Sequence, residues 1–279
     1  MIGFYGMGGG FGHLTRIRAF IRTYRPEAEI RVITANDQAH RFFHQDQIIL
    51  ASETDYQTPE SLHSFVSDTI SKHDFDKIYV DTFPAGILGE LTENVFGKIK
   101  INLLARRLRW NQYAPLLSTS NIHFDRVYVL EPLEPDHEAY LKTYSNQIVD
   151  AKLDYGSKEN LTPERPTDSP LWVICHSTNR EELASLVTHA QDVAAIEIAE
   201  PHLLILSDQE IDLPPNATHK SHTDPTHWFA SADRIFTAGG FNTMQQVLPY
   251  ISKHVCLPFP RRYDDQFWRA RYIKEEHLI

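Results

Sequence analysis

Residues 2–14 read IGFYGMGGGFGHL. The run opens with an apolar stretch of strand type, Ile2–Tyr5, passes through a series of glycines, and leads into an amphipathic pattern that predicts a helix over about 14–24. A strand, a glycine-rich turn and a helix in this order are typical of α/β folds, in which helices cover a parallel sheet. This stretch therefore predicts an α/β protein whose first strand starts at the second residue.

The same alternation continues along the chain. Strands are expected at 30–34, 48–51, 77–81, 99–104, 127–130, 171–175, 203–206, 234–237 and 254–257, and helices at 59–73, 181–189, 242–247 and 264–278. Parallel strands need long crossover connections, and helices between successive strands supply them. The pattern predicts parallel sheets with helices on both faces.

Length and one change in composition indicate two domains. A chain of 279 residues exceeds the usual size of a single domain, which is about 100–200 residues. Between 156 and 168 the large apolar residues give way to glycine, serine, asparagine and proline, which is typical of a linker. We expect an N-terminal domain over 1–155, a linker over 156–168 and a C-terminal domain over 169–279, with a cleft between the domains.

The overall composition disfavours several classes of function. A formal net charge of -10 would repel a nucleic-acid backbone. Cys175 and Cys256, the only cysteines, lie inside apolar runs and form neither a disulfide framework nor a thiolate metal site. Neither an export signal nor an apolar run of roughly 18 residues is evident, so we expect a cytoplasmic protein. His219, His222 and His227 lack an evident fourth ligand, and we predict no metal site.

The glycines of the first turn favour close approach of a ligand. Glycine lets the backbone adopt positive φ angles and brings N–H groups near a bound anion at the start of a helix. A dinucleotide-binding fingerprint would need a third glycine where Phe11 or His13 stands, and no Lys-Ser or Lys-Thr pair closes the loop as in a P-loop. A tight structural turn is the alternative interpretation.

His13 is the first candidate catalytic residue. A neutral imidazole at the start of a helix can accept a proton near pH 7, which makes His13 a candidate general base, although a purely structural histidine is common. Asp81 ends a predicted strand, at the edge of the sheet where open α/β folds bind ligands. It is expected either to orient His13 or to cap the turn before Thr82 and Pro84.

A second strand, turn and helix lie in the C-terminal half, where residues 232–243 read ADRIFTAGGFNT. A helix that opens after Gly239 and Gly240 with Asn242 and Thr243 presents backbone N–H groups suited to a diphosphate. Residues 258–266 read PFPRRYDDQ, in which two arginines could neutralise phosphate and the Asp-Gln pair could bind sugar hydroxyls. A solvated loop followed by a helix N-cap is the alternative.

These two segments, taken together, resemble a known family. Residues 8–16 look like the glycine-rich loop with histidine near the start of GT-B glycosyltransferases, among them the peptidoglycan N-acetylglucosaminyltransferase that makes lipid II. Residues 232–266 are similar to the donor-site signature of that family. The resemblance implies two Rossmann-like domains facing a cleft, an acceptor-side N-terminal domain and a donor-side C-terminal domain.

The resemblance also implies a reaction. It is the transfer of a sugar from a nucleotide diphosphate sugar, expected to be UDP-linked, to an acceptor hydroxyl, with inversion and without a metal or other cofactor. His13 would lie near that hydroxyl with Asp81 as its partner. Together with the glycine turn and the arginines described above, the predicted donor-binding residues are Gly10, Gly12, Gly239, Gly240, Asn242, Thr243, Gln246, Arg261, Asp265 and Gln266. Within this set Gln266 and Asp265 would contact the transferred sugar.

Three departures from the family pattern keep other functions open. Gln246 stands where many relatives place a Glu that binds the ribose hydroxyls, and the loss of charge should weaken that contact. Arg16 stands where the peptidoglycan enzymes have Pro, as in a poorly characterised branch with His-x-x-Arg. The chain also ends about one helix after Gln266. Gln246 and the short C-terminal segment make a non-catalytic nucleotide-sugar-binding or partner subunit one alternative. A sugar-nucleotide epimerase, which shares the fold, is the other.

Residues 98–110 form a basic segment without acidic residues in an otherwise acidic chain. Its cations are Lys98, Lys100, Arg106, Arg107 and Arg109. Such a segment could face anionic lipid or an anionic acceptor, which would place the protein peripherally at a membrane. A strand followed by a solvated helix face is the interpretation that we favour.

Overall fold

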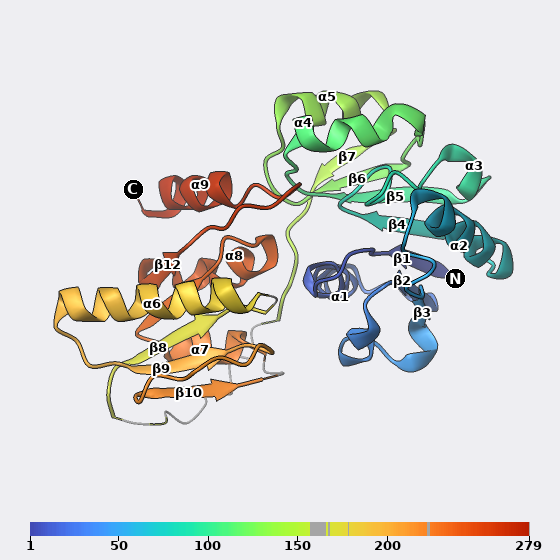
Figure 1. Cartoon of the computed structure of the whole chain (residues 1–279). Coiled ribbons are helices and arrows are strands. Elements are labelled where there is room, and N and C mark those ends of the chain that lie inside the picture. The colour runs from blue at the N-terminus through green and yellow to red at the C-terminus, as the bar shows by residue number, and fades with distance from the viewer. Residues whose placement is uncertain (157–165, 167, 178, 222–223, 279) are drawn as a thin grey trace. The chain divides into compact units, whose positions relative to one another are not determined.

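The computed structural model describes residues 1–156, 166, 168–177, 179–221 and 224–278, so that most of the predicted linker, 156–168, lies outside the described residues. The chain forms two compact units, each built around one parallel sheet (Figure 1). Unit 1 comprises Met1–Tyr155 with Arg262–Asp264, and unit 2 comprises Gly156–Arg261 with Asp265–Ile279. The polypeptide therefore returns to unit 1 for three residues shortly before its last helix.

The sheet of unit 1 has seven parallel strands in the order β3-β2-β1-β4-β5-β6-β7. The strands are β1 (Ile2–Tyr5), β2 (Ile30–Thr34), β3 (Ile48–Leu50), β4 (Lys77–Asp81), β5 (Lys100–Ala105), β6 (Arg126–Val129) and β7 (Ile148–Asp150). The chain fills the sheet outward from β1 in one direction and then, from β4, in the other. The carboxyl ends of β1 and β4 therefore form the topological switch point, where open α/β sheets bind ligands.

Helices cover both faces of this sheet because successive strand residues point to opposite sides. Phe4 packs edge-on against Phe20 of α1 (Gly12–Tyr24), whereas Tyr5 belongs to a core cluster with Leu62 and Val66 of α2 (Pro59–Lys72). Each buried aromatic or aliphatic side chain of this kind contributes about 1.5–3 kcal/mol. The remaining helical segments are α3 (Glu93–Phe96), α4 (Trp110–Tyr113), α5 (Pro135–Thr143), η1 (Asp37–Arg41), η2 (Gln45–Gln47) and η3 (Ala114–Thr119).

The sheet of unit 2 has five parallel strands in the order β10-β9-β8-β11-β12. The strands are β8 (Leu171–Cys175), β9 (His202–Leu206), β10 (Ala217–Lys220), β11 (Arg234–Thr237) and β12 (His254–Cys256). The helices are α6 (Arg180–Glu197), α7 (Thr226–Ser231), α8 (Phe241–Val247), η4 (Leu248–Lys253) and α9 (Gln266–Leu278). Leu183 and Leu186 of α6 pack on one face, and Phe229, Met244 and Ile273 pack on the other.

The predicted fold class, two Rossmann-like parallel-sheet units, is confirmed, and most of its strands lie within a residue of the predicted bounds. The sequence pattern missed β7 and β10, each of which lies at one edge of its sheet. β10 reads ATHK, without the continuous apolar run of a central parallel strand, and β7 has only three residues and ends at the exposed Asp150. The sequence pattern also placed the end of α6 too early, at 189. The helix continues to Glu197 through alanines, which are strong helix formers.

Candidate functional site

The first candidate site lies at the switch point of the unit 1 sheet. The glycine-rich turn leaves β1 and enters α1 at Gly12, and Asp81 is the last residue of the neighbouring strand β4. The pairing of β1 with β4 thus brings together residues that are 68 positions apart. The predicted pair of His13 and Asp81 is in direct contact: Nδ1 of His13 lies 2.6 Å from Oδ2 of Asp81.

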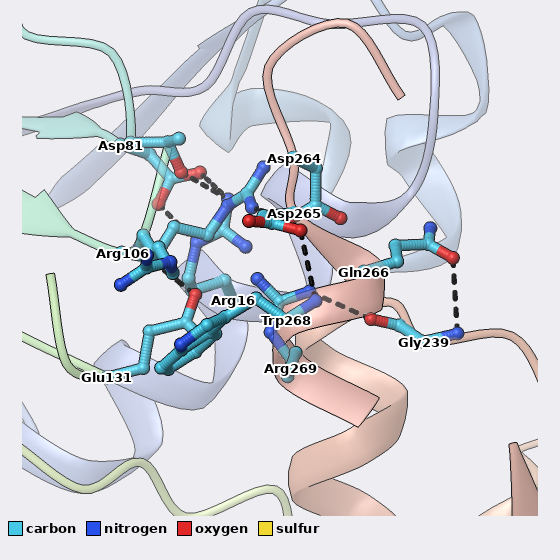
Figure 2. Close-up of polar contacts among 12 residues, drawn as sticks. Arg16, Asp81, Arg106, Glu131, Gly239, Asp264, Asp265, Gln266, Trp268 and Arg269 are labelled. Atoms are coloured by element: carbon cyan, nitrogen blue, oxygen red, sulfur yellow. Dashed lines mark hydrogen bonds and ion pairs between the residues drawn. The ribbon is translucent and has the colours of Figure 1, made fainter. Parts of the chain in front are cut away.

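Arg16 completes this cluster. Its Nε donates to Oδ1 of Asp81 at 2.6 Å, and its Nη2 donates to Oδ2 at 2.5 Å (Figure 2). The same Nη2 also donates to Oγ1 of Thr82 at 2.7 Å. The side chain of Asp81 is fully buried and that of Arg16 is 3% exposed, so the ion pair is shielded from solvent screening.

Burial and charge decide the protonation states of the pair. Burial by itself would raise the pKa of Asp81, but the Arg16 guanidinium and the hydrogen bond from His13 outweigh it and hold this pKa at about 2. Burial lowers the pKa of His13, an effect that Asp81 opposes and that Arg16 and Arg106 reinforce. At neutral pH an ionised Asp81 faces a neutral His13. Because a carboxylate only accepts hydrogen bonds, the ring proton lies on Nδ1 and the lone pair on Nε2.

The glycines of the turn make room for the protein's own side chains. A Cβ on Gly8, whose φ is +153°, would lie 2.8 Å from Cδ2 and Nε2 of the His13 ring. A Cβ on Gly6 would lie 2.6 Å from Cδ1 of Ile17. Gly10 is half-buried in the turn, and Gly12 is the exposed first residue of α1. Gly6 and Gly8 therefore have a steric requirement for glycine that is set by neighbouring side chains of the protein.

The returning segment Arg262–Asp264 packs beside this cluster, within unit 1. Tyr263 lies edge-on to the rings of Phe83 and Tyr113, and its carbonyl accepts a 2.8 Å hydrogen bond from the amide of Arg109. The ring of Phe83 in turn lies 5.7 Å from that of His13. Asp264 forms an ion pair with Arg106. The sequence predicted a helix from 264, whereas α9 starts at Gln266 because residues 262–264 are held by unit 1.

The basic segment 98–110 does not form one surface. Lys98 and Lys100 lie near the amino end of β5, whereas Arg106, Arg107 and Arg109 follow its carboxyl end. A strand of this length separates the two groups by roughly 17–20 Å. Arg106 is paired with Asp264, and the Arg107 guanidinium lies 3.7 Å from the Glu134 carboxylate. Of the favoured interpretation, a strand followed by a solvated helix face, the strand is present as β5, whereas Arg106, Arg107 and Arg109 precede α4 and Arg106 is buried.

The turn between β11 and α8 is closed from within unit 2 by the last helix. The amide of Gly239 donates to Oε1 of Gln266 at 3.2 Å, and the carbonyl of Gly239 accepts from Nη1 of Arg269 at 2.8 Å (Figure 2). Oε1 of Gln266 also accepts from the amide of Phe259 at 3.0 Å, and this side chain is buried. The Gly239 amide and the Gln266 oxygen, predicted to bind donor phosphate and sugar, are thus used by the protein itself.

The other predicted donor residues have different surroundings. Gly240 is the N-cap of α8, and a Cβ built on it would meet no atom within 4 Å. Asn242 and Thr243 lie in the first turn of α8, and Gln246 lies one turn further on; all three are half-buried. Asp265 accepts the amide of Trp268 at 3.0 Å, which is the geometry of an N-cap of α9. The Asp265 carboxylate therefore caps α9, as in the alternative interpretation of this segment.

Arg261 is held in an ion pair that the sequence did not predict. Its Nη1 donates to Oε1 of Glu182, in the first turn of α6, at 2.5 Å, and its Nη2 contacts Oε2. Nε2 of His176, just after β8, lies 2.9 Å from Oε2 of Glu182. The Arg261 charge is thereby offset by a carboxylate, which weakens the attraction that it could exert on a phosphate.

Two structural findings concern metals and membranes. Over the described ranges, His, Cys, Asp and Glu side chains do not gather in groups of three or more that could hold a metal ion. Nε2 of His219 lies 2.8 Å from the carbonyl oxygen of Ser207, and His222 lies outside the described residues. Of the helices that the structure describes, none combines the length and apolar character that a membrane crossing requires.

Solved structures share this fold across almost the whole chain. A glycosyltransferase of kitacinnamycin matches with a TM-score of 0.63 and 14% identity, covering 98% of this chain and 84% of its own. MurG from Acinetobacter baumannii matches with a TM-score of 0.56 and 15% identity, covering 99% and 83%. The fold is the GT-B fold of glycosyltransferases. The sequence matches no protein-family model and no curated protein.

The GT-B fold also occurs in epimerases. The UDP-N-acetylglucosamine 2-epimerase of Rickettsia bellii matches with a TM-score of 0.57 and 10% identity, covering 100% of this chain and 88% of its own. A fold hosts several chemistries, so the reaction has to be argued from the residues of the site. For this GT-B chain those residues include two that sequence reasoning did not place in the site, Arg16 and Gly8. Arg16 could have been found from the sequence, because it follows His13 by three positions on α1 and therefore lies on the same face of the helix.

Proposed function

We propose that this protein transfers a sugar from a nucleotide diphosphate sugar to an acceptor hydroxyl, with His13 as the general base. The observation that carries the proposal is the buried contact between His13 and Asp81 at the switch point of the first sheet of a GT-B fold. A neutral imidazole backed by an ionised carboxylate is well suited to general-base catalysis near neutral pH.

The proposed reaction is a single displacement at the anomeric carbon. Nε2 of His13 takes the proton of the acceptor hydroxyl while the acceptor oxygen forms its bond to the sugar. The bond from the sugar to the diphosphate breaks, and the nucleoside diphosphate leaves with the bonding electrons. The imidazolium that forms on His13 is stabilised by Asp81. One displacement inverts the configuration at the anomeric carbon.

We place the donor in unit 2, at the turn that contains Gly240. The support is the open space beside Gly240, together with the likeness of 232–266 to the donor signature of GT-B enzymes. Asn242 and Thr243 are the proposed phosphate ligands. Gln246 would bind the ribose through neutral hydrogen bonds, because it lacks the charge of a Glu. In the proposed reaction, protein groups stabilise the departing nucleoside diphosphate, and no cofactor takes part.

UDP-sugars are the donors to test first, since an enzyme named for UDP-N-acetylglucosamine has the same fold. For the acceptor, a contact with anionic lipid is proposed only for the exposed Lys98 and Lys100, because the arginines of the segment lie at the other end of β5.

The products formed from UDP-sugars test the proposed function. The protein is incubated with a panel of UDP-sugars, with and without a mixed set of hydroxyl acceptors, and the products are separated by mass spectrometry. Transfer predicts a glycosylated acceptor and an equal amount of UDP, both dependent on the acceptor. A 2-epimerised sugar or UDP formed from donor alone would instead favour an epimerase, which shares the fold. Binding of UDP-sugar without any product would identify a non-catalytic subunit.

A further inference from the structure

The side chain of Arg16 does more in the fold than balance one charge. It enters from α1, one turn after His13, and meets the end of β4 with three hydrogen bonds, two to Asp81 and one to Thr82. Residues three apart on a helix lie on the same face, so the His-x-x-Arg spacing directs both side chains to a single carboxylate. Oδ2 of Asp81 is shared between them.

The backbone at the end of β4 is held in an uncommon conformation. Thr82 has a φ of +72°, which is unfavourable for a β-branched residue, and its amide donates to the carbonyl of Leu104 at 2.9 Å. The amide of Phe83 donates to the carbonyl of Asp81 at 2.9 Å, which closes a three-residue turn around Thr82. Arg16 binds the carboxylate of the first residue of this turn and the hydroxyl of its central residue, so it ties these two residues together.

We propose that Arg16 is a positioning residue: its planar guanidinium fixes the rotation of the Asp81 carboxylate, and the carboxylate in turn fixes which nitrogen of His13 carries the proton. The inference rests on the proposed role of His13 as general base. A guanidinium fork binds two carboxylate oxygens in one plane, whereas an ammonium acts as a point charge and leaves the rotation open.

Charges on the surrounding elements define what else acts on the ring. Arg106, after β5, also faces His13, and Asp264 of the returning segment pairs with Arg106. Tyr155, at the end of unit 1, lies near both Arg16 and Asp81. Arg106 influences the charge of the imidazole directly, whereas the two-point contact with Asp81 is made by Arg16. Charge and orientation can therefore be separated by substitution.

The experiment compares Arg16→Lys, which keeps the charge without the fork, with Arg16→Gln, which keeps one donor without the charge. Arg22→Met is the control, since Arg22 is an exposed arginine of the same helix. Histidine labelled with ¹⁵N reports the tautomer of His13 in the whole protein, with His13→Gln used for assignment. Initial rates of UDP release, with the UDP-sugar found in the product screen, give kcat and the donor KM.

In the wild-type protein and in Arg22→Met we expect one tautomer, with the proton on Nδ1. In both Arg16 variants we expect a mixture of tautomers and a kcat lower by about 10²-fold at an unchanged donor KM, the loss typical of a misplaced catalytic group. If Arg16→Gln does not fold, Arg16→Lys decides alone. Either a retained Nδ1 tautomer or a kcat within twofold of wild type overturns the proposal. Absence of any sugar turnover would refute the proposed function, while the tautomer still decides the role of Arg16.

Discussion

The two glycine turns of this protein, Gly6–Gly12 and Gly239–Gly240, have the same local order of strand, turn and helix but different tertiary surroundings. Each follows a central parallel strand and leads into a helix. In unit 1 the turn is shaped around the ring of His13, which Gly8 accommodates. In unit 2 the turn is shaped around the start of α9, since a Cβ on Gly239 would lie 2.9 Å from the carbonyl oxygen of Gln266. Within each turn a glycine that is closely packed, Gly8 or Gly239, is followed by one that faces open space, Gly9 or Gly240.

The proposed function places the general base at the first turn, and the substitution with the largest expected effect tests this proposal. His13→Ala removes the proposed base and should slow sugar transfer by about 10²–10⁴-fold. Binding of UDP, measured by calorimetry, should stay intact because the donor is placed in unit 2. His40→Ala, an exposed histidine of η1, is the matched control. Transfer at the wild-type rate in His13→Ala would remove the first turn from the mechanism.

Gly8→Ala and Gly9→Ala form a pair that differs only in what the added methyl group meets. At Gly8 the methyl group would displace the His13 ring, and the backbone conformation is unfavourable for alanine. We expect a rate lower by about 10²-fold, as for a misplaced catalytic group. At Gly9 a Cβ meets no atom within 4 Å, and the rate should be unchanged. Equal rates in the two variants would show that the turn does not need to accommodate the ring.

Gly239→Ala and Gly240→Ala repeat the test on the second turn. Gly239→Ala should lower the free energy of unfolding by about 1–3 kcal/mol, because the start of α9 has to move. Gly240→Ala should leave stability unchanged and weaken UDP binding if a diphosphate approaches there. Urea unfolding measures the first effect, and calorimetry measures the second. Unchanged affinity in Gly240→Ala would place the diphosphate elsewhere in the protein.

The smallest effect concerns acid stability. Asp81 has a pKa of about 2 in the folded protein, compared with 3.8 for an unperturbed aspartate. Asp81 therefore binds fewer protons in the folded than in the unfolded state. Its contribution of about 2 kcal/mol is present above pH 4 and is lost as the pH falls toward 2. The lowered pKa of His13 acts in the same direction, with stability lost below about pH 6.5. Urea unfolding of wild type and Asp81→Asn from pH 7 to 2 measures the Asp81 contribution, and parallel curves between pH 4 and 2 would refute it.

Local sequence determined the elements of this protein. The central strand β8 was predicted with its observed bounds, because a strand buried on both faces reads as a continuous apolar run, here LWVIC. The turn at Gly6–Gly12, the start of α1 and the end of β4 at Asp81 were also readable, since glycine, helix periodicity and a terminal carboxylate are local signals. Two parallel-sheet units followed from the alternation of these elements.

Tertiary structure decided which side chains meet. The order of strands in the sheet sets β4 beside β1, and so brings Asp81 to His13 and Arg16. The packing of α9 brings Gln266 to Gly239, and that of α6 brings Glu182 to Arg261. Each of these contacts joins residues at least 27 positions apart. Hydrophobic burial selects the arrangement of whole elements, and a hydrogen bond between distant side chains exists only once that arrangement is in place.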